Sequence, residues 1–239
     1  MFLALDTVFG QCSVAIVTAS GEVVTSAVQT GNREQTQQIL PMVDAALTQS
    51  QLSLDKLSAL VFNRGPGAFS GIRINTAVIQ ALSVAHDLPC VGISSLQILA
   101  QAAYEQFAVE TCYAAHDARM KQVYIGEFAL VAELMQPQKT VIEGEGEHQG
   151  LDHEGLGYEW LLDYERQTPL NLPIVGDGGP LLSQHQNQLI LDSLSLDASI
   201  LGRLGVAQFA SAGGVPADQA LPIYLRNHAW KTLKEQGKA

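Results

Sequence analysis

The stretch that decides the fold is Asn63-Arg64-Gly65-Pro66-Gly67-Ala68-Phe69-Ser70-Gly71-Ile72-Arg73. It joins an apolar run at residues 57–62, typical of a buried strand, to an apolar helix predicted over residues 69–86. Gly65, Gly67 and Gly71 permit a tight turn and a close approach of two backbones. Free N–H groups at the start of the helix would also suit an anion. The motif therefore predicts a strand–turn–helix unit and leaves open whether it is only a turn or also an anion site.

The chain around this motif predicts alternating strands and helices. Strands are expected at residues 2–5, 13–19, 22–29, 57–62 and 89–93, and helices at 33–50, 69–86 and 95–107. Pro41 must kink the first helix or stand in its first turn. The resulting order, βββαβαβα, indicates an α/β sheet covered on both faces.

The second half of the chain repeats the opening of the first. Residues 111–117 and 122–130 again predict a strand, a turn and a strand, and Asp117 matches Asp6 at the end of the first strand. Helices are expected near 151–167, after Gly179 and near 198–212, with a strand at 173–175. The pattern predicts a duplicated fold with a reduced second copy and a cleft between the copies. The expected parts are a first lobe at 1–106, a second lobe at 107–223 and a basic tail at 224–239.

Composition narrows the class of protein. The 239 residues are 47% hydrophobic and 15% charged, which excludes a disordered chain. A net charge of −11 argues against broad nucleic-acid binding by this chain alone. The three cysteines, Cys12, Cys90 and Cys112, lie in apolar runs and are expected to be reduced core residues. Without a signal-like N-terminus or a span-length apolar run, the expectation is a soluble cytoplasmic protein with no membrane contact.

Few residues form a recognisable chemical motif. Gly176-Asp177-Gly178-Gly179 lies between a strand and a helix, where an adenosine cradle and a plain turn are equally good interpretations. No two histidines have the spacing of a helical metal site, and no Gly-x-Ser-x-Gly elbow supports a nucleophilic serine. No metal site is therefore expected. The helix at 69–86 is apolar on nearly every side, so it is central to its own lobe or packs against another chain.

Four motifs carry a resemblance to a known family. They resemble the TsaB (YeaZ) family, bacterial proteins needed for N6-threonylcarbamoyladenosine (t6A) at position 37 of tRNA. The motifs are Leu3-Ala4-Leu5-Asp6-Thr7, the stretch from Arg64 to Arg73, Asp117-Ala118-Arg119-Met120 with Val123-Tyr124, and Pro222-Ile223-Tyr224-Leu225-Arg226. The resemblance is dense over residues 1–124, sparse over 130–215, and resumes at the tail.

The resemblance implies a fold and a function. The fold would be the two-lobed actin-like, Hsp70-like (ASKHA) ATPase fold. The function would be that of a non-catalytic partner of TsaD, which transfers threonylcarbamoyl to tRNAs that read codons beginning with A. TsaD carries a metal-binding His-x-x-x-His pair, and alignment from Gly65 onward brings those two positions to Ser95 and Leu99. Neither side chain replaces an imidazole, so the resemblance implies a catalytically silent chain.

The resemblance also implies partners. The first-lobe helices would pair with TsaD, or with a second copy of this chain when TsaD is absent. TsaE would join the pair, and tRNA would be reached only through the complex. The candidate contact residues are Gln35, Gln38 and Met42 on the first helix and Ile74, Val78 and Leu82 on the helix at 69–86. Gln35 stands where the family commonly has histidine, so this position can hydrogen-bond but not carry a charge.

A nucleotide site would be vestigial. Its candidate residues are Asp6, Asp117, Gly176, Gly178 and Gly179. The resemblance implies no tightly bound cofactor and leaves room for weak or shared binding of ATP or ADP.

Two other functions compete with the scaffold interpretation: an independent ATP-dependent phosphotransferase of the same superfamily, and a metallopeptidase. The missing ligand pair counts against the metallopeptidase, and a phosphotransferase would need a phosphate loop and an acid acting as base.

Overall fold

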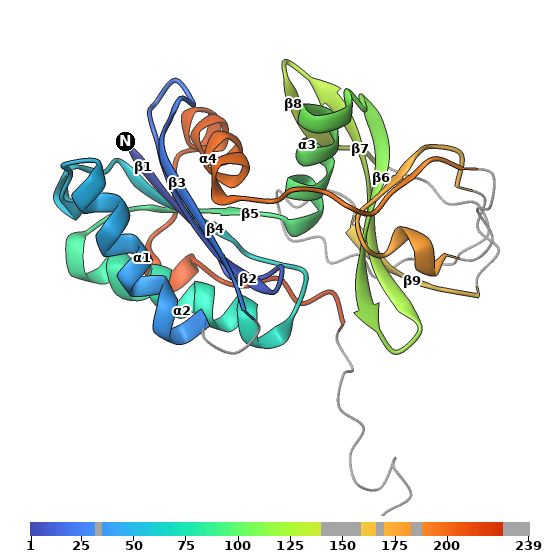
Figure 1. Cartoon of the computed structure of the whole chain (residues 1–239), viewed down its shortest axis with the longest axis horizontal. Coiled ribbons are helices and arrows are strands. Elements are labelled where there is room, and N and C mark those ends of the chain that lie inside the picture. The colour runs from blue at the N-terminus through green and yellow to red at the C-terminus, as the bar shows by residue number, and fades with distance from the viewer. Residues whose placement is uncertain (32–34, 140–158, 166–169, 183–187, 227–239) are drawn as a thin grey trace, which may run out of the picture.

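The computed structural model describes residues 1–31, 35–139, 159–165, 170–182 and 188–226. It has two lobes, each built on a mixed β-sheet (Figure 1). The first sheet has the order β3-β2-β1-β4-β5, with β1 Phe2–Asp6, β2 Gln11–Val17, β3 Val23–Thr30, β4 Ala59–Asn63 and β5 Cys90–Ile93. The second has the order β11-β10-β6-β7-β8, with β6 Thr111–Arg119, β7 Gln122–Val131, β8 Leu134–Pro137, β10 Ile174–Val175 and β11 Ile190–Leu191. A further strand, β9 (Glu159–Asp163), pairs with β7.

The two sheets confirm the predicted duplication. Each begins with three antiparallel neighbours, β1 to β3 in one and β6 to β8 in the other. In each, two parallel strands then extend the sheet from the first strand of the meander. Asp6 pairs with Ser13 across β1 and β2, and Asp117 pairs with Val123 across β6 and β7. The two aspartates therefore occupy corresponding places, as the sequence predicts.

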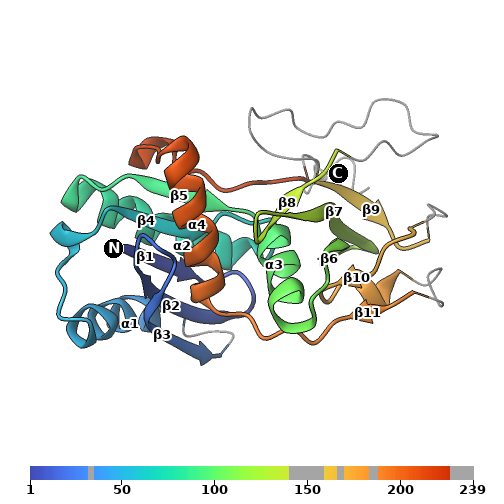
Figure 2. The same cartoon turned by 90° about the horizontal axis from the view of Figure 1, so that it is seen from above.

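Four α-helices in the described ranges cover the sheets. Helices α1 (Gln35–Gln49) and α2 (Phe69–His86) lie on the outer face of the first sheet, and α3 (Ser95–Phe107) and α4 (Ala198–Ala212) lie between the two sheets (Figure 2). Short 3-10 turns cover Leu54–Lys56, Gly179–Leu181 and Ala217–Gln219. The predicted bounds of α2, α3 and α4 are confirmed. Pro41 lies within α1, beyond its first described turn and on its exposed face.

The helices between the sheets are exchanged between the lobes. The α3 helix follows β5, yet Leu96, Leu99 and Ala103 pack with strands of the second sheet. The α4 helix follows β11, yet it packs on the first sheet. Gly205 permits this approach, because a Cβ there would lie 2.3 Å from Cγ1 of Val61. The packing units are therefore not the contiguous segments 1–106 and 107–223, since residues 198–223 return to the first lobe.

Two predicted helices of the second lobe differ from the structure. Residues 159–163, expected within a helix near 151–167, form β9, whose middle residue Leu161 pairs with Tyr124 of β7. The hydrogen bonds to β7 outweigh the weak helical pattern of this segment. Residues 151–158 and 166–167 lie outside the described residues. After Gly179 the chain forms only a 3-10 turn over 179–181, and 183–187 are not described.

The described residues also bear on three expectations about the core and the surface. Cys12, Cys90 and Cys112 are buried and unpaired, as expected of core cysteines. Burial raises the pKa of the Cys112 thiol to about 12. In the part of the chain that the structure describes, no helix has the length and hydropathy needed to cross a membrane.

Candidate functional site in the cleft between the lobes

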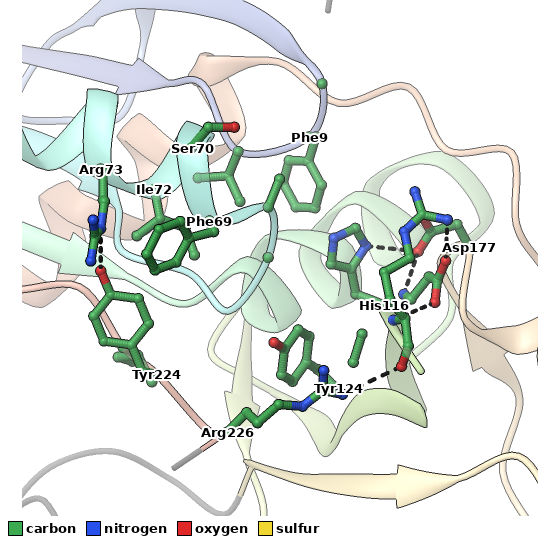
Figure 3. A pocket seen from close by; sticks show the side chains of 18 of the residues that line it. Phe9, Phe69, Ser70, Ile72, Arg73, His116, Tyr124, Asp177, Tyr224 and Arg226 are labelled. Atoms are coloured by element: carbon green, nitrogen blue, oxygen red, sulfur yellow. Dashed lines mark hydrogen bonds and ion pairs between the residues drawn. The ribbon is translucent and has the colours of Figure 1, made fainter. Parts of the chain in front are cut away.

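A pocket of about 950 Å³ opens between the two lobes (Figure 3). The first lobe contributes the β1–β2 turn and the first turn of α2. The second lobe contributes the end of β6, the β6–β7 turn and Asp177. Residues 223–226, near the end of the described chain, complete the wall. The predicted cleft is therefore present, and segments far apart in sequence line it.

The glycine-rich motif forms the turn that enters α2. Gly65 has φ +94°, a conformation that side chains disfavour. A Cβ on Gly67 would lie 2.4 Å from Cγ1 of Val8, and a Cβ on Gly71 would lie 2.3 Å from the carbonyl oxygen of Thr7. The Thr7 hydroxyl donates to the Gly71 carbonyl at 2.7 Å. These glycines thus allow the loop to pack directly on the β1–β2 turn, which supports the turn interpretation; the anion site stays a prediction.

A buried polar network joins the motif to β1. Asn63 donates from Nδ2 to Oδ2 of Asp6 at 3.1 Å. Its Oδ1 accepts from the Gly65 N–H at 3.0 Å and from the Ser95 hydroxyl at 2.7 Å. Burial raises the pKa of Asp6 to about 6. Two hydrogen bonds, from the Val8 N–H and from Asn63, oppose this rise, as does the electrostatic interaction with His116. Asp6 therefore positions the loops and does not itself line the pocket.

The second lobe places a paired set of groups at the pocket. Nδ1 of His116 lies 2.7 Å from Oδ1 of Asp177, which also accepts from the Asp117 N–H at 3.1 Å. The pKa of Asp177 is lowered, because interactions with His116, Asp117 and Arg119 outweigh its desolvation. Asp117 accepts from the Tyr164 hydroxyl at 2.8 Å and pairs with Arg119, also at 2.8 Å. Both carboxylates that face the pocket are thus engaged within the chain.

The second glycine cluster packs behind the pocket. Gly176 has φ +98°, and a Cβ there would lie 2.4 Å from the carbonyl oxygen of Ala115. The Gly178 N–H donates to the same carbonyl at 3.0 Å, and the Gly179 N–H donates to the Gly176 carbonyl at 3.1 Å. The Gly176 N–H donates to the Leu191 carbonyl at 2.8 Å, so all three N–H groups are used within the chain, and none of the three glycines lines the pocket. This arrangement supports the turn interpretation, and the adenosine cradle stays a prediction.

A further polar contact closes the floor between the lobes. The Ser94 hydroxyl, at the N-cap of α3, donates to Oε1 of Glu159 on β9. Burial raises the pKa of Glu159 to about 7, opposed by that hydrogen bond and by Arg64. Burial lowers the pKa of Arg64 to about 10. This contact links β9 to the N-terminus of α3.

The candidate contact residues fall into two groups. Gln35 and Met42 are buried: Gln35 donates from Nε2 to the Thr7 carbonyl at 3.2 Å, and Met42 belongs to the core beneath α1. Gln38 is half-buried. The other three residues are half-buried on α2 and pack against the same core; they are Ile74, Val78 and Leu82. Met42 is therefore removed from the exposed surface of the isolated chain, whereas Gln35 lines the cleft pocket and does not lie on an outer face.

The pocket also contains residues that sequence reasoning did not select as site residues. They are His116 and Asp177 from the second lobe, Phe69 and Arg73 from α2, and Tyr224 and Arg226 from the tail. Arg73, Tyr224 and Arg226 lie within the four motifs that carry the family resemblance. That location was the available signal, but motif membership alone does not show which side chains meet.

The fold and the cleft define the class of this protein. Two lobes with the same strand order, an exchanged helical layer and a pocket between them are the actin-like, Hsp70-like ATPase fold. The family model "TsaD: tRNA N6-adenosine threonylcarbamoyltransferase" matches residues 29–231. The "tRNA threonylcarbamoyladenosine biosynthesis protein TsaB" of Escherichia coli (strain K12) is 33% identical over 242 residues, covering 97% of each chain. That of Haemophilus influenzae is 33% identical over 238 residues, covering 97% of this chain and 96% of the relative.

Solved structures agree with these relatives. YeaZ from Pseudomonas aeruginosa superposes with a TM-score of 0.79 at 34% identity, covering 94% of this chain and 99% of that chain. A second structure from the same organism, described as similar to peptidase YEAZ, gives a TM-score of 0.80 at 35% identity. The chain therefore belongs to the TsaB (YeaZ) family, which the motifs predicted.

Proposed function

We propose that this chain is a non-catalytic subunit of the cytoplasmic complex that makes t6A at position 37 of tRNA, and that it acts by pairing with TsaD. Its relatives over almost the whole chain are named t6A biosynthesis proteins. The family model of the transferase itself also matches this chain, which supports descent from a common two-lobed ancestor.

The observation that carries the non-catalytic role is the environment of Ser95 and Leu99, where the resemblance places the metal ligands of TsaD. The Ser95 hydroxyl donates to Asn63 within the buried network, and its side chain has no exposed surface. Leu99 packs in the core between α3 and the second sheet. One position is thus part of a structural hydrogen bond and the other is apolar, so neither supplies an imidazole nitrogen.

The α2 helix supports a pairing surface on the first lobe. Ala77 and Ala81 are exposed, and half-buried Ile74, Val78 and Leu82 lie beside them. Small exposed side chains on an apolar helix let a second helix approach closely. We place TsaD on this face, and a second copy of this chain there when TsaD is absent. TsaE would join the assembled pair.

We further propose that the chain holds no tightly bound nucleotide and that ATP or ADP binds weakly or in a site shared with a partner. The groups named for such a site support this, since Asp6 is buried behind the pocket and the N–H groups of Gly178 and Gly179 are used within the chain.

Reconstitution tests the function. Purified TsaC, TsaD and TsaE are combined with tRNA, threonine, bicarbonate and ATP, with and without this chain, and t6A is measured. Product only in the presence of this chain supports the proposal. If partners that are active with a cognate TsaB make the same product without this chain, the modification role is wrong.

A surface variant tests the pairing face. Ala81→Glu places a charge on the exposed side of α2 and should weaken the TsaD complex at least about tenfold, because the carboxylate would be buried without a partner. Ala210→Glu, on the exposed end of α4, is the matched control and should leave the complex unchanged. Size-exclusion chromatography with TsaD measures both. An intact complex with Ala81→Glu would mean that α2 is not the contact.

A further inference from the structure

Two arginines stand on opposite walls of the cleft, and neither has a carboxylate partner among the residues that the structure describes. Arg73 stacks 3.7 Å over the Phe69 ring and donates from Nε to the Tyr224 hydroxyl at 3.3 Å. Arg226 donates to Oε1 of Gln122 at 2.7 Å and, more weakly, to neutral atoms of the β6–β7 turn. Within the described residues, no acidic group neutralises either guanidinium.

The remaining charges of the pocket are already paired. Arg119 pairs with Asp117, and Asp177 lies against His116. The net charge of the whole chain is −11, so two guanidinium groups at one cleft with no acidic partner in the described ranges are unexpected. Unpaired arginines next to aromatic rings are typical of sites that bind a phosphate backbone and stack its bases.

The β6–β7 turn forms part of this wall. Arg119, Met120 and Lys121 have φ values of +60°, +55° and +61°, which residues other than glycine rarely adopt. Arg226 helps to hold this turn by donating to the Arg119 carbonyl at 3.3 Å and to the Met120 sulfur at 3.0 Å. Ala132 and Glu133 of the β7–β8 turn have the same left-handed conformation, which tight hairpin turns require, so what distinguishes the β6–β7 turn is its contact with Arg226.

The cleft also offers flat apolar faces between the two arginines. The rings of Phe69 and Tyr224 lie 6.0 Å apart at the first-lobe wall, and Tyr124 lies near Arg226 at the other (Figure 3). Phe69 is 49% exposed and Tyr224 is 39% exposed, so both rings are open to a ligand. Planar bases stack on such rings in a way that does not depend on sequence.

We infer that this cleft binds a single-stranded segment of tRNA, with Arg73 and Arg226 on backbone phosphates and Phe69, Tyr224 and Tyr124 against bases. This inference rests on the proposed function. It adds a direct contact with tRNA, whereas the family resemblance implied that tRNA is reached only through the complex. Two phosphate contacts are few, so binding by the chain alone should be weak and the assembled complex should bind more tightly.

The test is titration of labelled, unmodified tRNA followed by fluorescence anisotropy at several salt concentrations. It uses the full chain alone at low salt and the complex with TsaD. Arg73→Gln and Arg226→Gln should each weaken binding about fivefold to tenfold, the effect of losing one charge-assisted contact. Each should also lower the slope of log affinity against log salt by about 0.7. Arg226→Lys, which keeps the charge, should retain most of the affinity.

Lys56→Gln is the matched control, because it removes one positive charge from an exposed site outside the pocket lining. The inference is overturned if both arginine variants bind like the unchanged chain, or if Lys56→Gln weakens binding equally. It is also overturned if millimolar AMP or ATP displaces the tRNA, since the phosphates bound would then be those of a free nucleotide. Pairing with TsaD is measured separately by size-exclusion chromatography. Loss of pairing would count against the proposed function. The RNA site would still be decided by tRNA binding to the chain alone.

Discussion

Replacing Asn63 by alanine tests the buried network beneath the cleft. Asn63 has no exposed surface, and its side chain contacts Asp6, Gly65 and Ser95 at once. The substitution removes the donor to a buried carboxylate and leaves the Gly65 N–H and the Ser95 hydroxyl without their acceptor. All three groups remain away from water, so each lost hydrogen bond carries a desolvation cost.

The magnitude follows from these three contacts. A hydrogen bond to a charged group contributes about 1.5–3 kcal/mol, and each unsatisfied buried neutral group costs about 1–3 kcal/mol. Asn63→Ala should therefore lower the free energy of unfolding by about 4–6 kcal/mol, a large part of the roughly 5–15 kcal/mol of an ordinary domain. Ser95→Ala removes one donor only, because Oδ1 of Asn63 still accepts from the Gly65 N–H, and should cost about 1 kcal/mol.

Urea unfolding followed by circular dichroism measures both variants against the unchanged chain. A second readout is the pKa of Asp6, which should rise further above about 6 because the Asn63 donor lowers it. The pKa is obtained from the pH dependence of the unfolding free energy. If Asn63→Ala costs no more than Ser95→Ala and leaves that pKa unchanged, Asn63 does not link the loops as described.

Three further results are expected. The pKa of Asp6 is raised from 3.8 to about 6 in the fold, so the folded state favours the protonated carboxyl. Stability should fall by about 2 kcal/mol as pH rises from 4 to 7, and Asp6→Asn should remove this slope in urea unfolding. Gly71→Ala should lower the unfolding free energy by about 1–3 kcal/mol, because the added Cβ would meet the Thr7 carbonyl. Gly31→Ala is the control, since a Cβ there meets open space and should change the unfolding free energy little. Equal melting temperatures of the two variants would contradict the close packing at Gly71. The Cys112 thiol, whose pKa burial raises to about 12, should react with thiol reagents at pH 8 only after unfolding, and rapid labelling of the native chain would contradict its burial.

Local signals explain which elements were predicted correctly. Helix α3 begins at Ser95 because the Ser94 side chain accepts the Leu96 N–H, and α4 begins after Asp197 in the same way. Helices α2 and α3 end where Asp87 and Ala108 take the left-handed conformation. Helix ends and apolar periods are properties of neighbouring residues, so a single sequence contains them.

Long-range pairing explains the elements that were predicted incorrectly. Residues 159–163 form a strand only because β7 offers them an edge, and that edge lies more than 28 residues earlier in the chain. Gln35 and Met42 were placed on an outer contact face, but both are buried once α1 packs on the first sheet. Neither outcome can be derived from the spacing of residues within the segment itself.

The sequence by itself determined the duplicated α/β class, the glycine-rich turn and the family, because these depend on short motifs and local periods. Only the tertiary structure decided which helix covers which sheet and which residues meet at the cleft. Arg73 reaches Tyr224 across 151 residues, and Arg226 reaches Gln122 across 104. Such contacts depend on how the whole chain packs, and Arg73 and Arg226 come to line one pocket only when both lobes and residues 223–226 are in place.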